Sequence, residues 1–334
     1  MSGHDRRGFL KALLRDAASA AQEVREAFKD EPAQETVEPF RLPAPQQAPP
    51  SRELLSEERL LELCRELGLE SRIDDVRRLA RTSVRLTRAT GPSKSRVGGL
   101  ADLPPEFVWP TYGDRDLAYV GQVSLDELAA TGADLLLPAD GLLLFFYDLT
   151  TSPSGLDPSH RGGARVLVID GASAMRDTSH PPSLRPLPVQ PSCELMVPSP
   201  WSFQAEALAL SDEEAERWDE LRSRVAEAQG VELEDKSPEW FALHRLLGYH
   251  DELGREPEVE CELATTGIDA EDYDKYYAHR EERAASARDW RLLLQISTDE
   301  ELQTPWPAFG RLYFFIREED LRACRFDAAW AILR

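Results

Sequence analysis

The chain has 334 residues, of which 42% are hydrophobic and 30% are charged, and its formal net charge is −22 at pH 7. This length is enough for one large or two ordinary globular domains. Binding to nucleic acid or to an anionic membrane needs a basic surface, so the charge argues against both partners for the main body of the protein. The sequence also contains no apolar run of the roughly 18–20 residues that cross a membrane.

Residues 1–29 predict an amphipathic helix, because apolar residues recur there at three- and four-residue steps. The Arg-Arg pair at its start also resembles a twin-arginine export signal, although charged residues interrupt the apolar stretch that such a signal requires. The residues expected to carry docking or targeting are Arg6, Arg7, Phe9, Leu10, Leu13 and Leu14.

Residues 30–52 are rich in Pro, Gln and Glu and predict an extended linker, since they cannot bury enough apolar surface to fold. A helix on such a tether is typical of a docking element. Three alternatives stay open for it: docking on the protein's own body, on a protein partner, or on a membrane surface.

The folded body is expected over residues 53–334, and it contains a segment that occurs twice. Residues 117–128 read LAYVGQVSLDEL and residues 290–301 read WRLLLQISTDEE; GLLLFFY and GRLYFFI follow them. Each copy predicts a strand, a short helix with a Ser-x-x-Glu capping box, a Pro-containing loop and a Gly-led aromatic strand. The sequences Gly-Leu-Ala-Asp102 and Gly-Tyr-His-Asp251 precede the two copies.

Other segments complete the expected order of elements. Residues 82–89 predict a strand, residues 177–200 a Pro-rich loop with at most one short strand, and residues 269–288 an inserted loop and helix. Helices are predicted over residues 211–229, opened by a capping box, and over residues 237–248, with Pro at the first helical position.

Together these elements predict an α+β fold with mixed sheets and an internal pseudo-duplication. Repeat one covers about residues 82–150, and repeat two covers about residues 238–334.

The repeated residues also carry a family resemblance. The sequence resembles the YwqG-like family, a bacterial domain of unknown function, over roughly residues 52–334. The matching motifs are Ser95-Arg96-Val97-Gly98-Gly99, Leu103-Pro104, Trp109-Pro110, Leu246-Leu247-Gly248-Tyr249, Glu260-Cys261-Glu262-Leu263, Trp290 to Ile296, Gly310 to Ile316, Phe326-Asp327 and Trp330. The resemblance implies a mixed α/β domain in the cytoplasm, and it implies no activity and no catalytic residues.

Several residues are candidates for ligand or partner contacts. Arg96 with Gly98-Gly99 offers a cation and backbone N–H groups that could hold an anion, although a Gly pair more often serves a turn. Gln122 and Gln295 occupy equivalent places inside apolar strands, where they either line a shared cleft or tie each strand to a loop. Trp109 and Trp306 neighbour prolines and are candidates for exposed interface anchors.

Catalytic and metal signatures are absent from the sequence. There is no GxSxG motif, no CxxC, and His244 and His250 are six residues apart, which does not suit joint ligation on a helix. The four cysteines stand far apart, as expected for reduced thiols in a cytoplasmic protein. No catalytic residue, metal or cofactor is predicted.

The sequence therefore favours a non-enzymatic binding or adaptor module for a protein partner, with the N-terminal helix as a docking element. The alternatives are an enzyme or small-ligand-binding protein with a site between the two repeats, and an exported or membrane-surface protein. The oligomeric state is left open.

Overall fold

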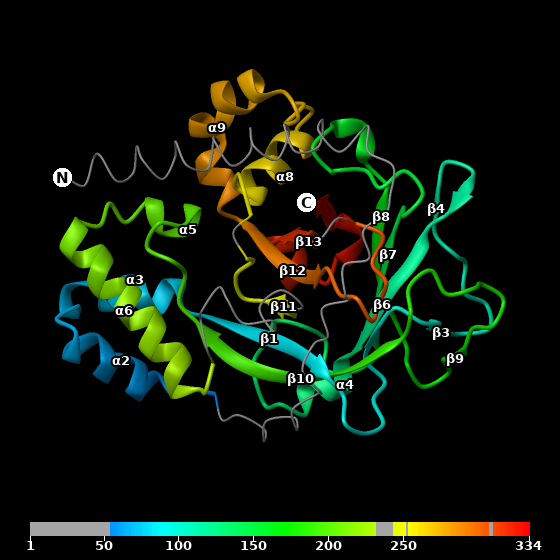
Figure 1. Ribbon diagram of the computed structural model, residues 1–334, viewed down its shortest axis with the longest axis horizontal. Helices are drawn as coiled ribbons and strands as arrows, with labels where there is room; N and C mark the ends of the chain where they lie inside the picture. The colour runs from blue at the N-terminus through cyan, green and yellow to red at the C-terminus, as the bar shows by residue number, and fades with distance from the viewer. Residues whose placement is uncertain (1–53, 232–242, 252, 307–309) are drawn as a thin grey trace, which may run out of the picture. The chain divides into compact units, whose positions relative to one another are not determined.

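The computed structural model describes residues 54–231, 243–251, 253–306 and 310–334 (Figure 1). The predicted N-terminal helix and linker lie outside these residues. The chain divides into two units, of which the larger comprises Pro45–Asp251 and Glu256–Arg334. The elements that follow belong to the larger unit.

Its main feature is a ten-stranded, nearly closed sheet whose described pairs are all antiparallel. The strand order is β14-β13-β12-β11-β1-β10-β2-β6-β7-β8. The predicted combination of helices and strands is confirmed, but the expectation of mixed sheets is wrong. The strands are β1 (Arg81–Arg88), β2 (Arg96–Val97), β6 (Ala118–Ser124), β7 (Leu142–Tyr147), β8 (Ala164–Ile169), β10 (Leu187–Met196), β11 (His244–Leu247), β12 (Trp290–Ser297), β13 (Arg311–Arg317) and β14 (Trp330–Leu333).

Two four-strand halves flank the central pair β1 and β10 (Figure 1). The first half is β2-β6-β7-β8, and the second half is β11-β12-β13-β14. The pairings β6–β7 and β12–β13 each contain one register shift, between Tyr119 and Gly121 in the first and between Leu292 and Leu294 in the second. These two irregularities fall at equivalent places in the aligned segments.

The inner faces of both halves share one apolar core. Phe145 of β7 and Phe314 of β13 meet edge to face there, with ring centroids 5.2 Å apart. Val84 and Leu86 of β1 point into the same core. Apolar side chains from the two halves therefore pack against each other inside the sheet.

Different elements cover the outer faces. The outer face of the second half packs against α8 (Pro257–Thr265) and α9 (Tyr273–Ala287), and the latter confirms the predicted inserted helix. Loops and the short pairs β3–β9 and β4–β5 cover the outer face of the first half. The remaining elements are α2 (Glu57–Glu66), η1 (Glu70–Arg72), α3 (Ile73–Leu79), β3 (Asp102–Leu103), β4 (Thr111–Tyr112), β5 (Arg115–Asp116), α4 (Leu125–Ala129), η2 (Pro158–His160), β9 (Met175–Arg176), α5 (Phe203–Glu206), α6 (Asp212–Ala228), α10 (Glu318–Arg322) and η3 (Phe326–Ala328).

Three expectations about individual elements are wrong. The Pro-rich segment predicted to be mainly loop contains β10, a central strand. The helix predicted over residues 237–248 is replaced at its end by strand β11, while residues 237–242 lie outside the described residues. No helix directly follows Ser297 in the described part of the second copy; the Ser297 hydroxyl donates to the Leu243 carbonyl, and the Asp299 carboxylate accepts from the N–H groups of Glu301 and Leu302.

The capping box that opens α6 is confirmed. The Ser211 hydroxyl accepts from the N–H of Glu214 at 3.3 Å, and the Glu214 carboxylate accepts from the N–H of Ser211 at 2.9 Å. The Nε of Arg72 also donates to Glu214, at 2.7 Å. The hydrogen bond from Arg72, followed by the one from Ser211, lowers the pKa of Glu214 from 4.5 to about 2.

The lowered pKa of Glu214 leads to a prediction for unfolding at acid pH. The stabilisation from ionised Glu214 is complete above the unfolded-state pKa near 4.5 and is lost as pH falls toward about 2. We expect Glu214→Gln, which retains a capping acceptor, to flatten the pH dependence of unfolding free energy across that window, measured by urea denaturation at several pH values. Arg72→Gln should flatten it too. A wild-type profile in both variants would contradict the assignment.

Candidate functional site

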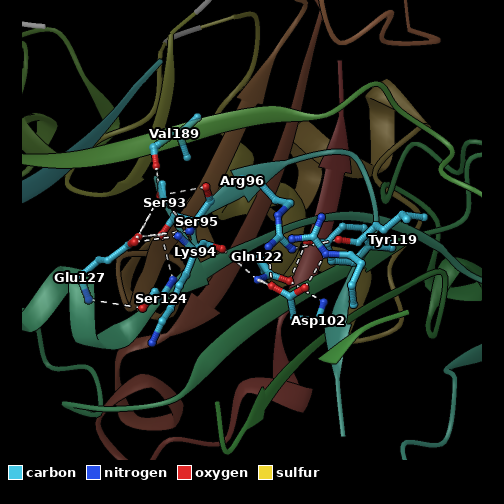
Figure 2. Close-up of polar contacts among 12 residues, drawn as sticks. Ser93, Lys94, Ser95, Arg96, Asp102, Tyr119, Gln122, Ser124, Glu127 and Val189 are labelled. Atoms are coloured by element: carbon cyan, nitrogen blue, oxygen red, sulfur yellow. Dashed lines mark hydrogen bonds and ion pairs between the residues drawn. The ribbon is translucent and has the colours of Figure 1, made fainter. Parts of the chain in front are cut away.

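The side-chain amide of Gln122 joins β6 to the segments before and after β2 (Figure 2). Its oxygen accepts from the backbone N–H of Asp102 at 3.0 Å and from the Tyr119 hydroxyl at 3.1 Å. Its nitrogen donates to the Lys94 carbonyl and to Oδ2 of Asp102, both at 2.9 Å. Gln122 is 1% exposed, so these four bonds satisfy groups that would be costly to bury unpaired.

Gln295 makes the equivalent contacts in the second half. Its oxygen accepts from the backbone N–H of Asp251 at 3.0 Å. Its nitrogen donates to the Leu243 carbonyl at 3.1 Å and to Oδ2 of Asp251 at 2.7 Å. Gln295 is fully buried. We call the two arrangements the Gln122 clasp and the Gln295 clasp.

An arginine accompanies each clasp at the same place. Arg96 pairs in register with Gln122, and Arg245 pairs in register with Gln295. Each arginine donates from Nη1, at 2.9 Å, to the backbone carbonyl four residues further along, which belongs to Leu100 or Tyr249. The matching aspartates are those of the Gly-x-x-Asp sequences that precede the two copies.

The residue before each arginine accepts a hydrogen bond from the backbone N–H of the serine that ends β6 or β12, although the two accepting side chains differ. The Ser95 hydroxyl accepts from the N–H of Ser124 at 2.9 Å and donates to the Glu127 carboxylate at 2.5 Å (Figure 2). In the second half, Nδ1 of His244 accepts from the N–H of Ser297 at 3.2 Å, and its Nε2 lies 3.5 Å from Asp299. An accepting Nδ1 places the proton of the neutral imidazole on Nε2, toward Asp299.

The backbone turns sharply after both arginines. Gly98 and Gly99 have φ angles of +67° and +73°, and their counterparts Leu247 and Gly248 have +56° and +69°. A Cβ on Gly98 would lie 2.2 Å from the Arg185 carbonyl oxygen, so this position needs glycine. The N–H groups of Gly98 and Gly99 donate to the backbone carbonyls of Val120 and Leu184. Neither N–H is therefore free to hold an anion.

The structure does not bring the two glutamines into one cleft. Gln122 pairs with Leu144 and Gln295 pairs with Tyr313, and both partners belong to the apolar clusters outside the sheet. Four strands separate β6 from β12 in the sheet. Each glutamine thus ties its own strand to its own loop, which is the second of the two roles predicted from the sequence.

The Gln122 clasp is the more open of the two. Asp102 receives hydrogen bonds from two arginines, Arg96 and, at 2.6 Å from its Nε, Arg176, whose side chain is 52% exposed. Burial of Asp102 opposes its ionisation, but the bonds from Arg96 and Arg176 outweigh this effect and lower its pKa. The counterpart Asp251 is paired with the fully buried Arg311.

Two exposed apolar residues lie on the segments that carry this open clasp. Val108 is 84% exposed and Met175 is 64% exposed, and they are the most exposed large apolar residues of the described chain. Their two segments contact each other, because Met175 pairs with Leu103 in β3–β9. We call these two exposed residues on their neighbouring segments the Val108–Met175 patch.

A second contact joins the same two segments. The ring of His180 stacks on Trp109 with centroids 3.7 Å apart, and Nδ1 of His180 lies 2.8 Å from Oδ2 of Asp177. The Trp109 indole N–H donates to the Leu117 carbonyl at 2.8 Å, which fixes the ring. Trp109 and His180 are both partly exposed, and Trp109 directly follows Val108 in the chain.

Trp306, the other tryptophan predicted to be an exposed interface anchor, lies in a different environment. Trp306 is 6% exposed and packs in the core inside the sheet, so the expectation of an exposed ring is wrong. Arg96 is also buried. The two Gly-x-x-Asp segments are visible in the sequence, but nothing there identifies Asp102 and Asp251 as the partners of the glutamines. No sequence pattern marks Val108, Met175 or His180 as surface or site residues.

The described residues contain no cluster of three or more His, Cys, Asp or Glu side chains arranged to hold a metal ion. Over the same residues, no helix is both long enough and apolar enough to cross a membrane. A family model described as a domain of unknown function (DUF1963) matches residues 95–334. No curated protein matches the chain.

Proposed function

The chain belongs to the DUF1963 family of uncharacterised domains, and from this premise we propose that it is a binding or adaptor module for a protein partner. The observation that carries the proposal is the exposure of Val108 and Met175 on neighbouring segments. The partner would present an apolar segment to the Val108–Met175 patch and the adjoining Trp109–His180 stack.

The surroundings of the patch support docking over a purely structural role. Single exposed apolar residues are common on protein surfaces, but here two lie on segments that are fixed to each other by a strand pair and a ring stack. Aromatic side chains held in place lose little entropy when a partner binds, which makes them effective anchors.

Substituting the patch tests this proposal. We expect Val108→Asp to weaken binding of the partner by roughly tenfold or more, because a charge would be buried against an apolar segment. Unfolding free energy should change by less than about 0.5 kcal/mol, since Val108 contacts mainly solvent. The partner is identified by quantitative capture from source cells, and its dissociation constant is then measured with purified proteins by calorimetry.

The matched control is Trp201→Asp, because Trp201 is 56% exposed but lies in another part of the chain. This variant should bind the partner as the wild type does. Equal binding by the Val108 and Trp201 variants would contradict the assignment of the patch.

We further propose that residues 1–29 form a second docking element, as the amphipathic pattern suggests. Deletion of residues 1–30 should remove a subset of partners from the captured set while binding at the patch persists. An unchanged set would refute this role. The YwqG-like assignment, the internal duplication and a cytoplasmic setting belong to the same proposal, and the equivalent clasps support the duplication.

A further inference from the structure

A group of arginines lies on the outer face of the neighbouring strands β1 and β11. Arg85 of β1 and Arg245 of β11 are directly opposite each other in the antiparallel register. Arg81, four residues before Arg85, is on the same face because side chains alternate along a strand. Like charges placed directly opposite on paired strands repel each other, so this arrangement needs a compensating negative charge.

One carboxylate serves two of these arginines, Arg85 and Arg245. Glu194 of β10 accepts from Nε of Arg85 at 3.1 Å and lies 3.7 Å from Nη2 of Arg245. The side chains of Glu194 and Arg245 are each 5% exposed, and that of Arg85 is 18% exposed. The charges of Arg85 and Arg245 are thus met by one carboxylate in a region with little access to water, within a protein whose net charge is strongly negative.

Arg245 is only partly satisfied. Its Nε is buried without a hydrogen-bond partner among the described residues, and its Nη1 contacts the Met196 sulfur and the Tyr249 carbonyl. The equivalent Arg96 pairs with the aspartate of its own clasp, but the corresponding Asp251 pairs with Arg311 instead. The second half therefore leaves this arginine without its own carboxylate.

Arg81 has no ion pair with any residue in the described ranges. Its guanidinium lies over the ring of Tyr249, 4.4 Å from the centroid, and burial lowers its pKa. The carboxylates near it, Glu258 and Glu318, are already paired with His250 and with Arg291.

We propose that Arg85 and Arg245, with Arg81 further along the same face of β1, form a binding site for a small oxyanion, such as a phosphate group. Arginine presents planar N–H donors that match the oxygens of phosphate, and a desolvated site strengthens such charge-assisted bonds. Glu194 remains as the group that holds Arg85 and orients it. This site is independent of the Val108–Met175 patch.

Phosphate binding is measured on the full chain by calorimetry and by thermal unfolding, with chloride at equal ionic strength as the reference. At about ten times its dissociation constant, inorganic phosphate should raise the melting temperature by roughly 2–4 °C over chloride. Glycerol 3-phosphate is tested in parallel, and tighter binding of this ester would assign the site to an organic phosphate. No difference between phosphate and chloride would overturn the proposal.

Substitutions of single arginines test whether phosphate binds at this site. Arg85→Met should abolish the phosphate response, and Arg85→Lys, which keeps the charge and the fold, should weaken binding several-fold through loss of the planar donors. Arg224→Met is the control, because Arg224 is an exposed arginine paired with Glu220 on α6. A phosphate response that is the same in wild type, Arg85→Lys and Arg224→Met would show a general salt effect and overturn the site.

Discussion

Replacing Gln295 with leucine is expected to lower the free energy of unfolding by about 2–4 kcal/mol. Leucine fills a similar volume but leaves the N–H of Asp251 buried without an acceptor, and it removes one donor each from the Leu243 carbonyl and the Asp251 carboxylate. Those two acceptors keep Ser297 and Arg311 as partners, which limits the loss. Urea denaturation followed by circular dichroism measures the change.

The equivalent change in the first half is the matched comparison. Gln122→Leu should cost less, about 1–3 kcal/mol, because Asp102 keeps two arginine partners and its side chain is 17% exposed to water. A larger loss for Gln122→Leu than for Gln295→Leu would contradict the view that the second clasp is the more deeply sealed.

Removing the carboxylate of Glu262 is expected to destabilise the protein by about 3–5 kcal/mol. Glu262 is a buried residue of α8 whose carboxylate accepts from Nη2 of Arg317, from the Trp290 indole at 3.1 Å and from the Ser286 hydroxyl at 2.9 Å. Glu262→Ala leaves all three donors without this acceptor and opens a gap between α8, α9 and β12. Chemical denaturation again provides the measurement.

Two further variants separate charge from packing. Glu262→Gln retains an acceptor for the neutral donors and should lose roughly half as much stability. Glu281→Ala, on the exposed side of α9, should change stability by less than about 0.5 kcal/mol. Near-equal effects of Glu262→Ala and Glu281→Ala would contradict the proposed role of the buried carboxylate.

The sequence predicted the strands of the aligned copies because their apolar and aromatic runs are long and bounded by clear turn residues. It also predicted α6, since its Ser-x-x-Glu box is a local signal that the structure uses without change. Strand β10 was missed because Pro188 and Pro191 lie within it. The side of β10 that faces β2 pairs with it at Leu187 and Pro188, so this side is open at Pro191, where a residue without an N–H is tolerated.

Contacts between segments far apart in the sequence explain the other differences between the predicted and the observed structure. His244–Leu247 is a short apolar run that fits a helix or a strand, and only its pairing with β1 and β12 decides between them. Glutamines at matching positions indicated an equivalent structural role, but the aspartate partners are distant in sequence. The Val108–Met175 patch arises where two separate loops meet, so no local pattern could reveal it.

Site-specific photo-crosslinking in the source cells tests the docking function most directly. Benzoylphenylalanine is placed at positions 108 and 175 and, for comparison, at the exposed positions 201 and 277. The account predicts that positions 108 and 175 crosslink to the same protein and that positions 201 and 277 do not. Crosslinking to that protein as often from position 201 as from position 108, or no discrete adduct from 108 and 175, would contradict it.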